Sequence, residues 1–404
     1  MKIVYCTNSI GTRGGIERVT IVKANALAEI ESNEVYIVFT DEKNYPETIY
    51  PLSPKVNVVN LNVRHWDDQY TSFFERFFIP KWKMIKHFVR LQKFVSEVCP
   101  DILISVGQSE KYILPLLYGT RVLVREVHFN STYRYDTYGN SWIRRLKAKV
   151  FSLLDFRLLC KMYDMTFLLT KQDKEENFSK IAYIEYMHNP STFFVDGLCN
   201  SISKRENVIL SVGRLNYQKN YLALIRIWAS ICAKYPNWLL RIVGEGPQRK
   251  ELENLIRCLN LEDRVELIGF SNKVDYYMRS AKIFAMTSLF EGLALVSIEA
   301  MACRLPLVSY ETKYGPRDLI VNNINGFLVP MNDETLFAQK LSALIENKDL
   351  RMKMSLEAEK RASDFEVDKI INQWMKVFNH LLGLNYHLMI VLLSLKYLHF
   401  EFVL

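Results

Sequence analysis

The 404-residue sequence lacks the features that mark a disulfide-stapled, zinc-binding or exported protein. Its seven cysteines are scattered, odd in number and never arranged as a C-x-x-C pair. This spacing disfavours both a disulfide framework and a zinc site, and it indicates a reducing compartment. The N-terminal stretch MKIVYCTNSI lacks the basic start and long apolar region of a signal peptide, and we interpret it as a first strand.

Long apolar runs are also missing, since no segment offers about 18 uninterrupted apolar residues. The nearest candidate is the tail, whose cleanest run covers residues 388–395 and lies between His387 and Lys396. We therefore expect a tail that packs or lies at an interface, and not a full membrane span. Hydrophobic residues at 49%, charged residues at 24% and a net charge of +8 suit a folded chain of two or three domains.

Short apolar runs alternate with amphipathic stretches along the whole chain. Runs such as KIVYCT, EVYIVFT and VILSVGRL are rich in β-branched residues, while YLALIRIWASICAKYP carries a helical pattern. This alternation is typical of parallel sheets covered by helices on both faces. Because the pattern occurs twice, we predict an α/β protein with two doubly wound, Rossmann-like domains that face a deep interdomain cleft.

The polar stretch DGLCNSISKREN, residues 196–207, is the predicted linker between the halves. It separates a predicted N-terminal domain, residues 1–195, from a predicted C-terminal domain, residues 208–365. Residues 366–404 are expected to form a helix that packs back on the N-terminal domain, followed by the apolar tail. Interdomain clefts and the carboxyl ends of parallel strands are common ligand sites, so motifs at those ends are candidates for function.

The stretch VGRLNYQKN brings two cations to the carboxyl end of a predicted strand. The strand delivers Gly213, Arg214 and Lys219 to the following loop. An arginine can bind a diphosphate bidentately and a lysine can bind it as a point charge, so the pair can hold a diphosphate. Two exposed loop cations are the alternative. In the next loop, VGEGPQRKEL, Arg249 stands where a dinucleotide fingerprint needs glycine, which disfavours an NAD site.

Two carboxylates, Glu291 and Glu299, stand eight residues apart in SLFEGLALVSIEA, where a strand leads through a loop into a helix. Backbone N–H groups at a helix N-terminus favour an anion, and Gly292 allows a ligand to approach the backbone closely. A carboxylate repels a phosphate but accepts hydrogen bonds from a vicinal diol. We therefore expect both glutamates to be ionised and to bind sugar or ribose hydroxyls beside a phosphate site. Acids that offset a helix dipole would explain either glutamate alone, but less well the whole loop.

The N-terminal half contributes a glycine loop and a histidine. GTRGGIERV places Gly14 and Gly15 between the first strand and the first helix, where a phosphate or an acceptor can approach closely. REVHFN places His128 at the carboxyl end of a strand. Taken alone, the glycines are equally consistent with a flexible turn, and the histidine with a structural or solvated role.

Together these residues resemble retaining glycosyltransferase family four, whose members have the GT-B fold. The E-x7-E motif of the family matches Glu291 and Glu299, and its G-R-x4-K element matches the cation loop. Its N-terminal glycine loop matches Gly14 and Gly15, and its N-domain histidine matches His128. The chain departs from the pattern in two places: Ala294 replaces a frequent glycine or proline, and Phe129–Asn130 follows His128 where many members have an acid.

The resemblance implies transfer of a hexose-type sugar from a UDP- or GDP-sugar, with retained anomeric configuration and without a metal ion or other cofactor. Arg214 and Lys219 would hold the diphosphate, Glu299 the ribose hydroxyls, and Glu291 and His128 the donor sugar. These roles make His128, Glu291, Arg214 and Lys219 the implied catalytic residues. The implied donor site consists of Gly14, Gly15, Gly213, Arg214, Lys219, Glu291, Gly292, Leu293, Ala294, Leu295 and Glu299.

A basic and aromatic stretch in the N-terminal half predicts a membrane-facing surface. From Arg76 to Lys93 the chain carries six Lys/Arg and no acid, and a second basic stretch covers residues 144–161. Basic amphipathic helices are typical of membrane surfaces, and an ordinary helix with a basic outer face is the alternative. The predicted membrane contacts are Trp82, Lys83, Lys86, Arg90 and Lys93.

The sequence thus predicts a cytoplasmic glycosyltransferase, peripheral on the inner face of an anionic membrane, with a lipid-linked saccharide acceptor. Its pathway would be the synthesis of surface polysaccharide or glycolipid. No motif supports binding of nucleic acid. Two other functions remain open, a nucleotide-sugar epimerase of the same fold and a non-catalytic sugar-nucleotide binding module. A glycoside hydrolase is disfavoured, because it leaves the cations beside the two glutamates unexplained.

Overall fold

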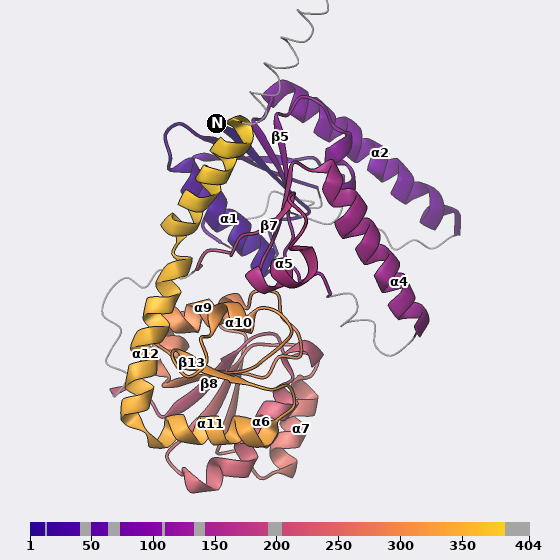
Figure 1. Cartoon of the computed structure of the whole chain (residues 1–404). Coiled ribbons are helices and arrows are strands. Elements are labelled where there is room, and N and C mark those ends of the chain that lie inside the picture. Colours follow the sequence, from indigo (N-terminus) through magenta and orange to yellow (C-terminus); the bar gives the residue numbers. More distant parts are fainter. Residues whose placement is uncertain are drawn as a thin grey trace, which may run out of the picture.

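The computed structural model describes residues 1–12, 14–40, 50–63, 73–106, 110–132, 142–192 and 204–383. Two parallel sheets, one in each half of the chain, are each packed by helices on both faces (Figure 1). The predicted α/β architecture of two doubly wound domains is confirmed. The predicted linker lies largely outside the described residues, as does the tail from residue 384 onward.

The N-terminal sheet has seven parallel strands in the order β3-β2-β1-β4-β5-β6-β7. They are β1 (Lys2–Thr7), β2 (Glu34–Phe39), β3 (Val56–Asn60), β4 (Ile102–Ser105), β5 (Val122–Glu126), β6 (Met165–Leu168) and β7 (Ile184–Tyr186). The central strands β4 and β5 are buried throughout, because helices cover both faces of the sheet. The strand order reverses between β1 and β4, so the carboxyl ends of these strands border a switch point where ligands commonly bind.

The helices of this domain are α1 (Gly15–Ala28), α2 (Phe73–Val98), α4 (Trp142–Leu153) and α5 (Lys171–Phe178). Ile21, Ala24 and Leu27 of α1 pack on one face of the sheet, and Leu91 and Val95 of α2 pack on the other. Helix α4 continues into a π-helical turn, η3 (Leu154–Leu158), and a 3-10 turn, η4 (Leu159–Met162). Figure 1 shows α2 and α4 extending from the same side of the N-terminal domain.

The C-terminal sheet has six parallel strands in the order β10-β9-β8-β11-β12-β13. They are β8 (Val208–Val212), β9 (Leu239–Val243), β10 (Val265–Gly269), β11 (Ile283–Met286), β12 (Leu307–Tyr310) and β13 (Gly326–Val329). Its helices are α6 (Tyr221–Ile231), α7 (Arg249–Cys258), α8 (Val274–Ser280), α9 (Leu295–Ala302), α10 (Pro316–Leu319), α11 (Glu334–Glu346) and α12 (Lys348–Ala362). Helices α6, α7 and α11 pack on one face of the sheet and α9 and α12 on the other.

A C-terminal helix, residues 367–383, returns from the C-terminal domain to the N-terminal one (Figure 1). Its apolar side, including Ile370, Trp374 and Phe378, joins the same core cluster as Ile3 and Tyr5 of β1. The two domains are therefore connected by a second, helical crossing besides the one near residue 190.

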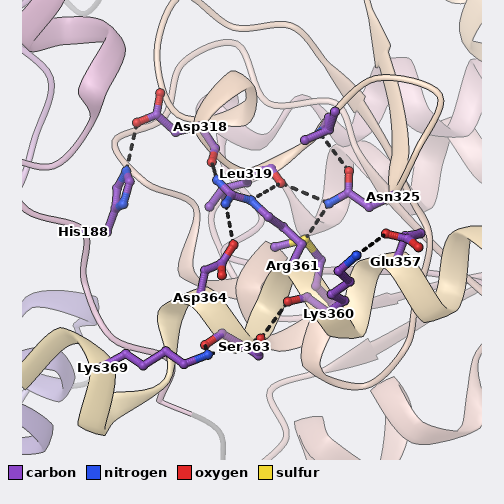
Figure 2. A network of polar contacts seen from close by, with 12 residues as sticks. His188, Asp318, Leu319, Asn325, Glu357, Lys360, Arg361, Ser363, Asp364 and Lys369 are labelled. Carbon is purple, nitrogen blue, oxygen red and sulfur yellow. Dashed lines mark hydrogen bonds and ion pairs between the residues drawn. The ribbon is translucent and has the colours of Figure 1, made fainter.

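A polar network joins the two domains near these crossings (Figure 2). The carboxylate of Asp318 in α10 accepts a hydrogen bond from the backbone N–H of Lys171 at 2.6 Å. It also lies 3.0 Å from Nε2 of His188, as Figure 2 shows. Arg361 of α12 donates to the Asp318 carbonyl and to the Asp364 carboxylate. The carboxylate of Asp318 thus lies against the N-terminus of α5, where backbone N–H groups lack helical partners and favour an anion.

Candidate active site

A cleft of about 610 Å³ lies between the carboxyl ends of the two sheets. Its C-terminal wall consists of the loops after β8, β9, β10 and β11, and its N-terminal wall includes the start of α1 and the loop after β5. Every predicted donor-site residue except Gly14 lines it, as does His128. Gly14 instead forms the N-cap of α1, directly before Gly15. Residues far apart in sequence therefore meet in one cleft.

Two glycines allow the backbone segments after β8 and β9 to approach each other closely in the C-terminal wall of the cleft. Gly213 and Gly244 directly follow β8 and β9 with φ of 157° and 149°, a region that side chains disfavour. A Cβ on Gly244 would lie 1.9 Å from the carbonyl oxygen of Gly213, so the two strand ends approach too closely for any side chain. Arg214 follows as an exposed residue on the cleft wall, and its guanidinium makes no hydrogen bond or ion pair within the described part of the chain.

Lys219 and Glu291, predicted to bind different parts of a donor, are in direct contact. Lys219 Nζ lies 2.6 Å from Glu291 Oε1, and the side chains are 17% and 8% exposed. From the opposite wall, Asn130 Nδ2 donates to the carbonyl oxygen of Glu291 at 2.8 Å. The asparagine that departs from the family pattern after His128 thus ties the two walls together.

Glu299 is buried one turn into α9, and its partners come from outside the C-terminal domain. Its Oε1 accepts hydrogen bonds from Arg18 Nη1 of α1 at 2.7 Å and from Thr192 Oγ1 at 2.5 Å. Burial raises the pKa of the Glu299 carboxyl, and Arg18 and Thr192 offset this effect only in part. Sequence reasoning missed both partners; the position of Arg18, one helical turn after the glycine loop, was the only available signal.

The loop between the two glutamates is packed backbone against backbone. A Cβ on Gly292 would lie 3.1 Å from Leu169 and 3.4 Å from the carbonyl oxygen of His128, both on the N-terminal wall. Behind it, Gly315 has φ of 100°, and a Cβ there would lie 2.4 Å from the carbonyl oxygen of Gly292. Ala294 is buried as the N-cap of α9, which begins at Leu295. The N–H groups at the start of α9 therefore border the cleft.

His128 lies at the other side of the cleft with a side chain only 3% exposed. Its Nε2 is 3.3 Å from Oε2 of Glu126, the last residue of β5. The geometry of this contact falls short of a hydrogen bond, so the interaction is mainly electrostatic. Glu126 was not among the predicted site residues.

The predicted membrane contacts on α2 differ in their surroundings. Trp82 is 69% exposed, and Lys93 lies 3.8 Å from Glu97 on the surface of the helix. Arg90 donates to the carbonyl oxygens of Leu61 and Asn62, so part of its charge is used within the fold. Lys83 and Lys86 are partly buried. No helix within the described ranges is long and apolar enough to cross a membrane.

Comparisons with known proteins identify the family of the chain. Residues 200–361 match the family model of glycosyl transferases group 1. The chain is 32% identical to an uncharacterized glycosyltransferase of Haemophilus influenzae over 381 residues, which covers 92% of this chain and 98% of the relative. The chain belongs to the group 1 glycosyltransferases. This is the family that its motifs predicted, and membership disfavours the epimerase and the binding module that the sequence left open.

Two further comparisons place this glycosyltransferase among its relatives. It is 27% identical, over 93% of its length and 98% of the relative, to a Campylobacter jejuni enzyme. That enzyme is named "GalNAc-alpha-(1->4)-GalNAc-alpha-(1->3)-diNAcBac-PP-undecaprenol alpha-1,4-N-acetyl-D-galactosaminyltransferase". The fold of the present chain is similar to that of a mutant of S. aureus TarM, which was solved in a complex that includes UDP. The TM-score is 0.74 and the identity is 15%, over 94% of this chain and 99% of the TarM chain. The fold of this glycosyltransferase is therefore GT-B.

Proposed function

We propose that this glycosyltransferase transfers a hexose-type sugar from a UDP- or GDP-sugar to an acceptor, with retained anomeric configuration and without a metal ion. The observation that carries the proposal is the meeting of Arg214, Lys219, Glu291 and Glu299 in one cleft. Cations there can offset the charge that develops on a departing diphosphate, and carboxylates can accept hydrogen bonds from sugar hydroxyls. Retention and metal independence follow the family resemblance.

Each wall would have its own task. In the C-terminal domain, Arg214 and Lys219 would bind the diphosphate together with the N–H groups at the start of α9. Glu299 would accept hydrogen bonds from the ribose, and Glu291 from the donor sugar. Lys219 lies 2.6 Å from Glu291, so one lysine can contact the leaving group while it orients the carboxylate beside the sugar. The N-terminal domain would present His128 to the donor sugar and bind the acceptor.

We further propose a lipid-linked saccharide acceptor and a peripheral position on the inner face of an anionic membrane. The named undecaprenol-linked saccharide of the Campylobacter relative supports the acceptor class. The surface of α4 through η4 supports the location, because large apolar side chains there face solvent. They are Trp142, Ile143, Leu146, Val150, Phe151, Leu153, Leu154, Leu158 and Met162.

Charges on this surface match an anionic membrane. Lys147, Lys149, Arg157 and Lys161 are exposed beside the apolar residues. The single acid of the segment, Asp155, is buried in ion pairs with Lys111 and Arg125. Each cation near an anionic lipid surface contributes about 1 kcal/mol, and exposed tryptophan and leucine suit the interface. The surface thus combines positive charge with apolar area and leaves its acid out of contact with the lipid.

Vesicle flotation tests this location. Wild-type protein is expected to float with vesicles that contain phosphatidylglycerol and not with neutral vesicles. Leu146→Glu in α4 should abolish flotation, while Leu356→Glu in α12, at a similarly exposed leucine of the other domain, should not. Equal flotation of the wild type and Leu146→Glu would contradict a membrane contact through α4.

The reaction itself is tested with a panel of UDP- and GDP-sugars. A donor that binds should raise the midpoint of thermal unfolding, because a ligand that binds only the folded state stabilises it. The same donor is then incubated with a short saccharide diphosphate acceptor in EDTA, and the anomeric configuration of the product is read by NMR. An inverted product would contradict retention, and loss of activity in EDTA would contradict metal independence.

A further inference from the structure

A buried ion pair lies directly behind His128. Lys23 of α1 and Glu126 of β5 are 1% and 6% exposed, and Lys23 Nζ donates to Glu126 Oε2. The same oxygen lies 3.3 Å from Nε2 of His128. Of these three residues only His128 lines the cleft. One carboxylate oxygen is therefore shared between a buried lysine and the histidine of the N-terminal wall.

The surroundings of the pair hold it in place. The ammonium group of Lys23 lies 5.6 Å from the ring centre of Tyr5 and 5.2 Å from that of Trp374, within the range of cation–π attraction. Trp374 belongs to the C-terminal helix and also packs edge-on against Phe167 of β6. The pair is thus enclosed by α1, two strands and the helix that returns from the other domain.

Stability alone explains such a pair poorly. Removing two charges from water is costly, and apolar residues of similar volume often serve a core as well or better. Within the described part of the chain, Oε1 of Glu126 has no hydrogen-bond partner, so the carboxylate is not fully satisfied either. Burial by itself would raise the pKa of Glu126, but Lys23 and His128 outweigh it and hold that pKa below its ordinary value. The carboxylate is therefore ionised where it faces the histidine.

We propose that Glu126, held by Lys23, is a positioning residue that fixes the ring and the tautomer of His128 for the donor sugar. An ionised carboxylate beside Nε2 favours a proton on that nitrogen, which leaves Nδ1 as the acceptor of the ring. Nδ1 makes no hydrogen bond to any described residue, and His128 lines the cleft, so a sugar hydroxyl can donate to it there. The inference rests on the proposed transferase reaction.

Two variants separate positioning from folding. Glu126→Asp keeps the charge for Lys23 but withdraws the carboxylate from His128 by one methylene. The double variant K23M/E126Q removes both charges, so neither is left buried and unpaired. We expect kcat to fall about 10- to 100-fold in both, as for other residues that orient a functional histidine, with the donor KM within about threefold. Thermal midpoints should stay close to that of the wild type.

A double-mutant cycle provides the readout that a structural role would not move. His128→Ala should lower kcat, and adding Glu126→Asp to it should lower kcat no further, because the group that Glu126 positions is gone. Lys111→Met serves as the control: it removes another buried lysine of the N-terminal domain, while Asp155 keeps its ion pair with Arg125. It should leave kcat within about twofold of the wild type.

The outcomes are distinct. Wild-type kcat in both Glu126→Asp and K23M/E126Q would overturn the positioning role, as would equal losses for Glu126→Asp in the presence and absence of His128. If the wild-type protein transfers no sugar from any donor of the panel, the proposed function fails instead. Loss of folding in K23M/E126Q with wild-type kcat in Glu126→Asp would show that the pair only stabilises the domain.

Discussion

The two walls of the cleft hold their charged groups in different ways. On the C-terminal wall, Lys219 and Glu291 form an ion pair whose side chains keep some contact with solvent, at 17% and 8% exposure. On the N-terminal wall, Lys23 and Glu126 pair inside the core behind His128, which lines the cleft. A partly exposed pair can exchange partners with a ligand, whereas opening a buried pair leaves a charge unpaired at a cost of about 3–5 kcal/mol. We infer that the first wall binds and the second orients.

The largest effect should come from the cations of the binding wall. The double variant R214A/K219A removes the charges that would offset the departing diphosphate, so kcat/KM should fall by about 100- to 1,000-fold or more. Initial rates with the donor identified by thermal shift measure the loss. Arg226→Ala is the control, because that exposed arginine pairs with Glu334 away from the cleft. A loss of less than tenfold in R214A/K219A would remove the diphosphate role.

Glu299 joins the two walls, and its loss should weaken donor binding more than the chemical step. Glu299→Ala removes the carboxylate that would accept hydrogen bonds from the ribose hydroxyls, at a cost of about 1–3 kcal/mol, or about 5- to 150-fold in donor Kd. Calorimetric titration with the intact donor measures the change. Glu334→Ala, at a partly exposed carboxylate of the same domain that does not line the cleft, should bind the donor as the wild type does. Full donor affinity in Glu299→Ala would contradict the ribose assignment.

The polar network at Asp318, which joins the two domains, should matter more for stability than for activity. Asp318→Ala leaves N–H groups of α5 and the side chain of His188 without their partner, so we expect a loss of about 1–3 kcal/mol in the free energy of unfolding. Urea denaturation measures it. Asp364→Ala is the matched control in the same network, because its exposed pair with Arg361 is worth less than about 1 kcal/mol. Equal losses in both variants would show that the junction is not anchored at Asp318.

The binding wall could be predicted from the sequence because its residues are close together in the chain. The cation loop and the two glutamates each fall within one strand-loop-helix unit, where spacing decides which groups reach the cleft. The ion pair behind His128 could not be predicted, since Lys23 and Glu126 lie 103 positions apart and pair only through the packing of α1 on β5. Distance in the sequence also explains a second gap: the basic helical pattern of α2 did not indicate that Arg90 donates a hydrogen bond to a carbonyl group of the loop after β3.

The smallest effect, and the most specific to the contact between the walls, is a pH dependence of donor binding. The pKa of Glu299 is raised by burial, so this carboxyl takes up a proton at a higher pH in the folded protein than in the unfolded chain. Its contribution to stability is therefore present below the unfolded pKa and is lost as pH rises through the folded pKa. Donor binding should depend on pH in the opposite direction, because only the ionised form of Glu299 would accept hydrogen bonds from both ribose hydroxyls.

Acidification should accordingly weaken donor binding while it favours the folded state at this site. Below the raised pKa, the donor Kd should rise by up to about tenfold per pH unit. Glu299→Gln should bind weakly at all pH values, and its stability relative to the wild type should be greatest at neutral pH and shrink on acidification. Calorimetry and thermal unfolding across the same pH series measure both trends. A wild-type donor Kd that does not change down to the ordinary pKa of a glutamate would show that the contact with Arg18 and Thr192 keeps Glu299 ionised despite its burial.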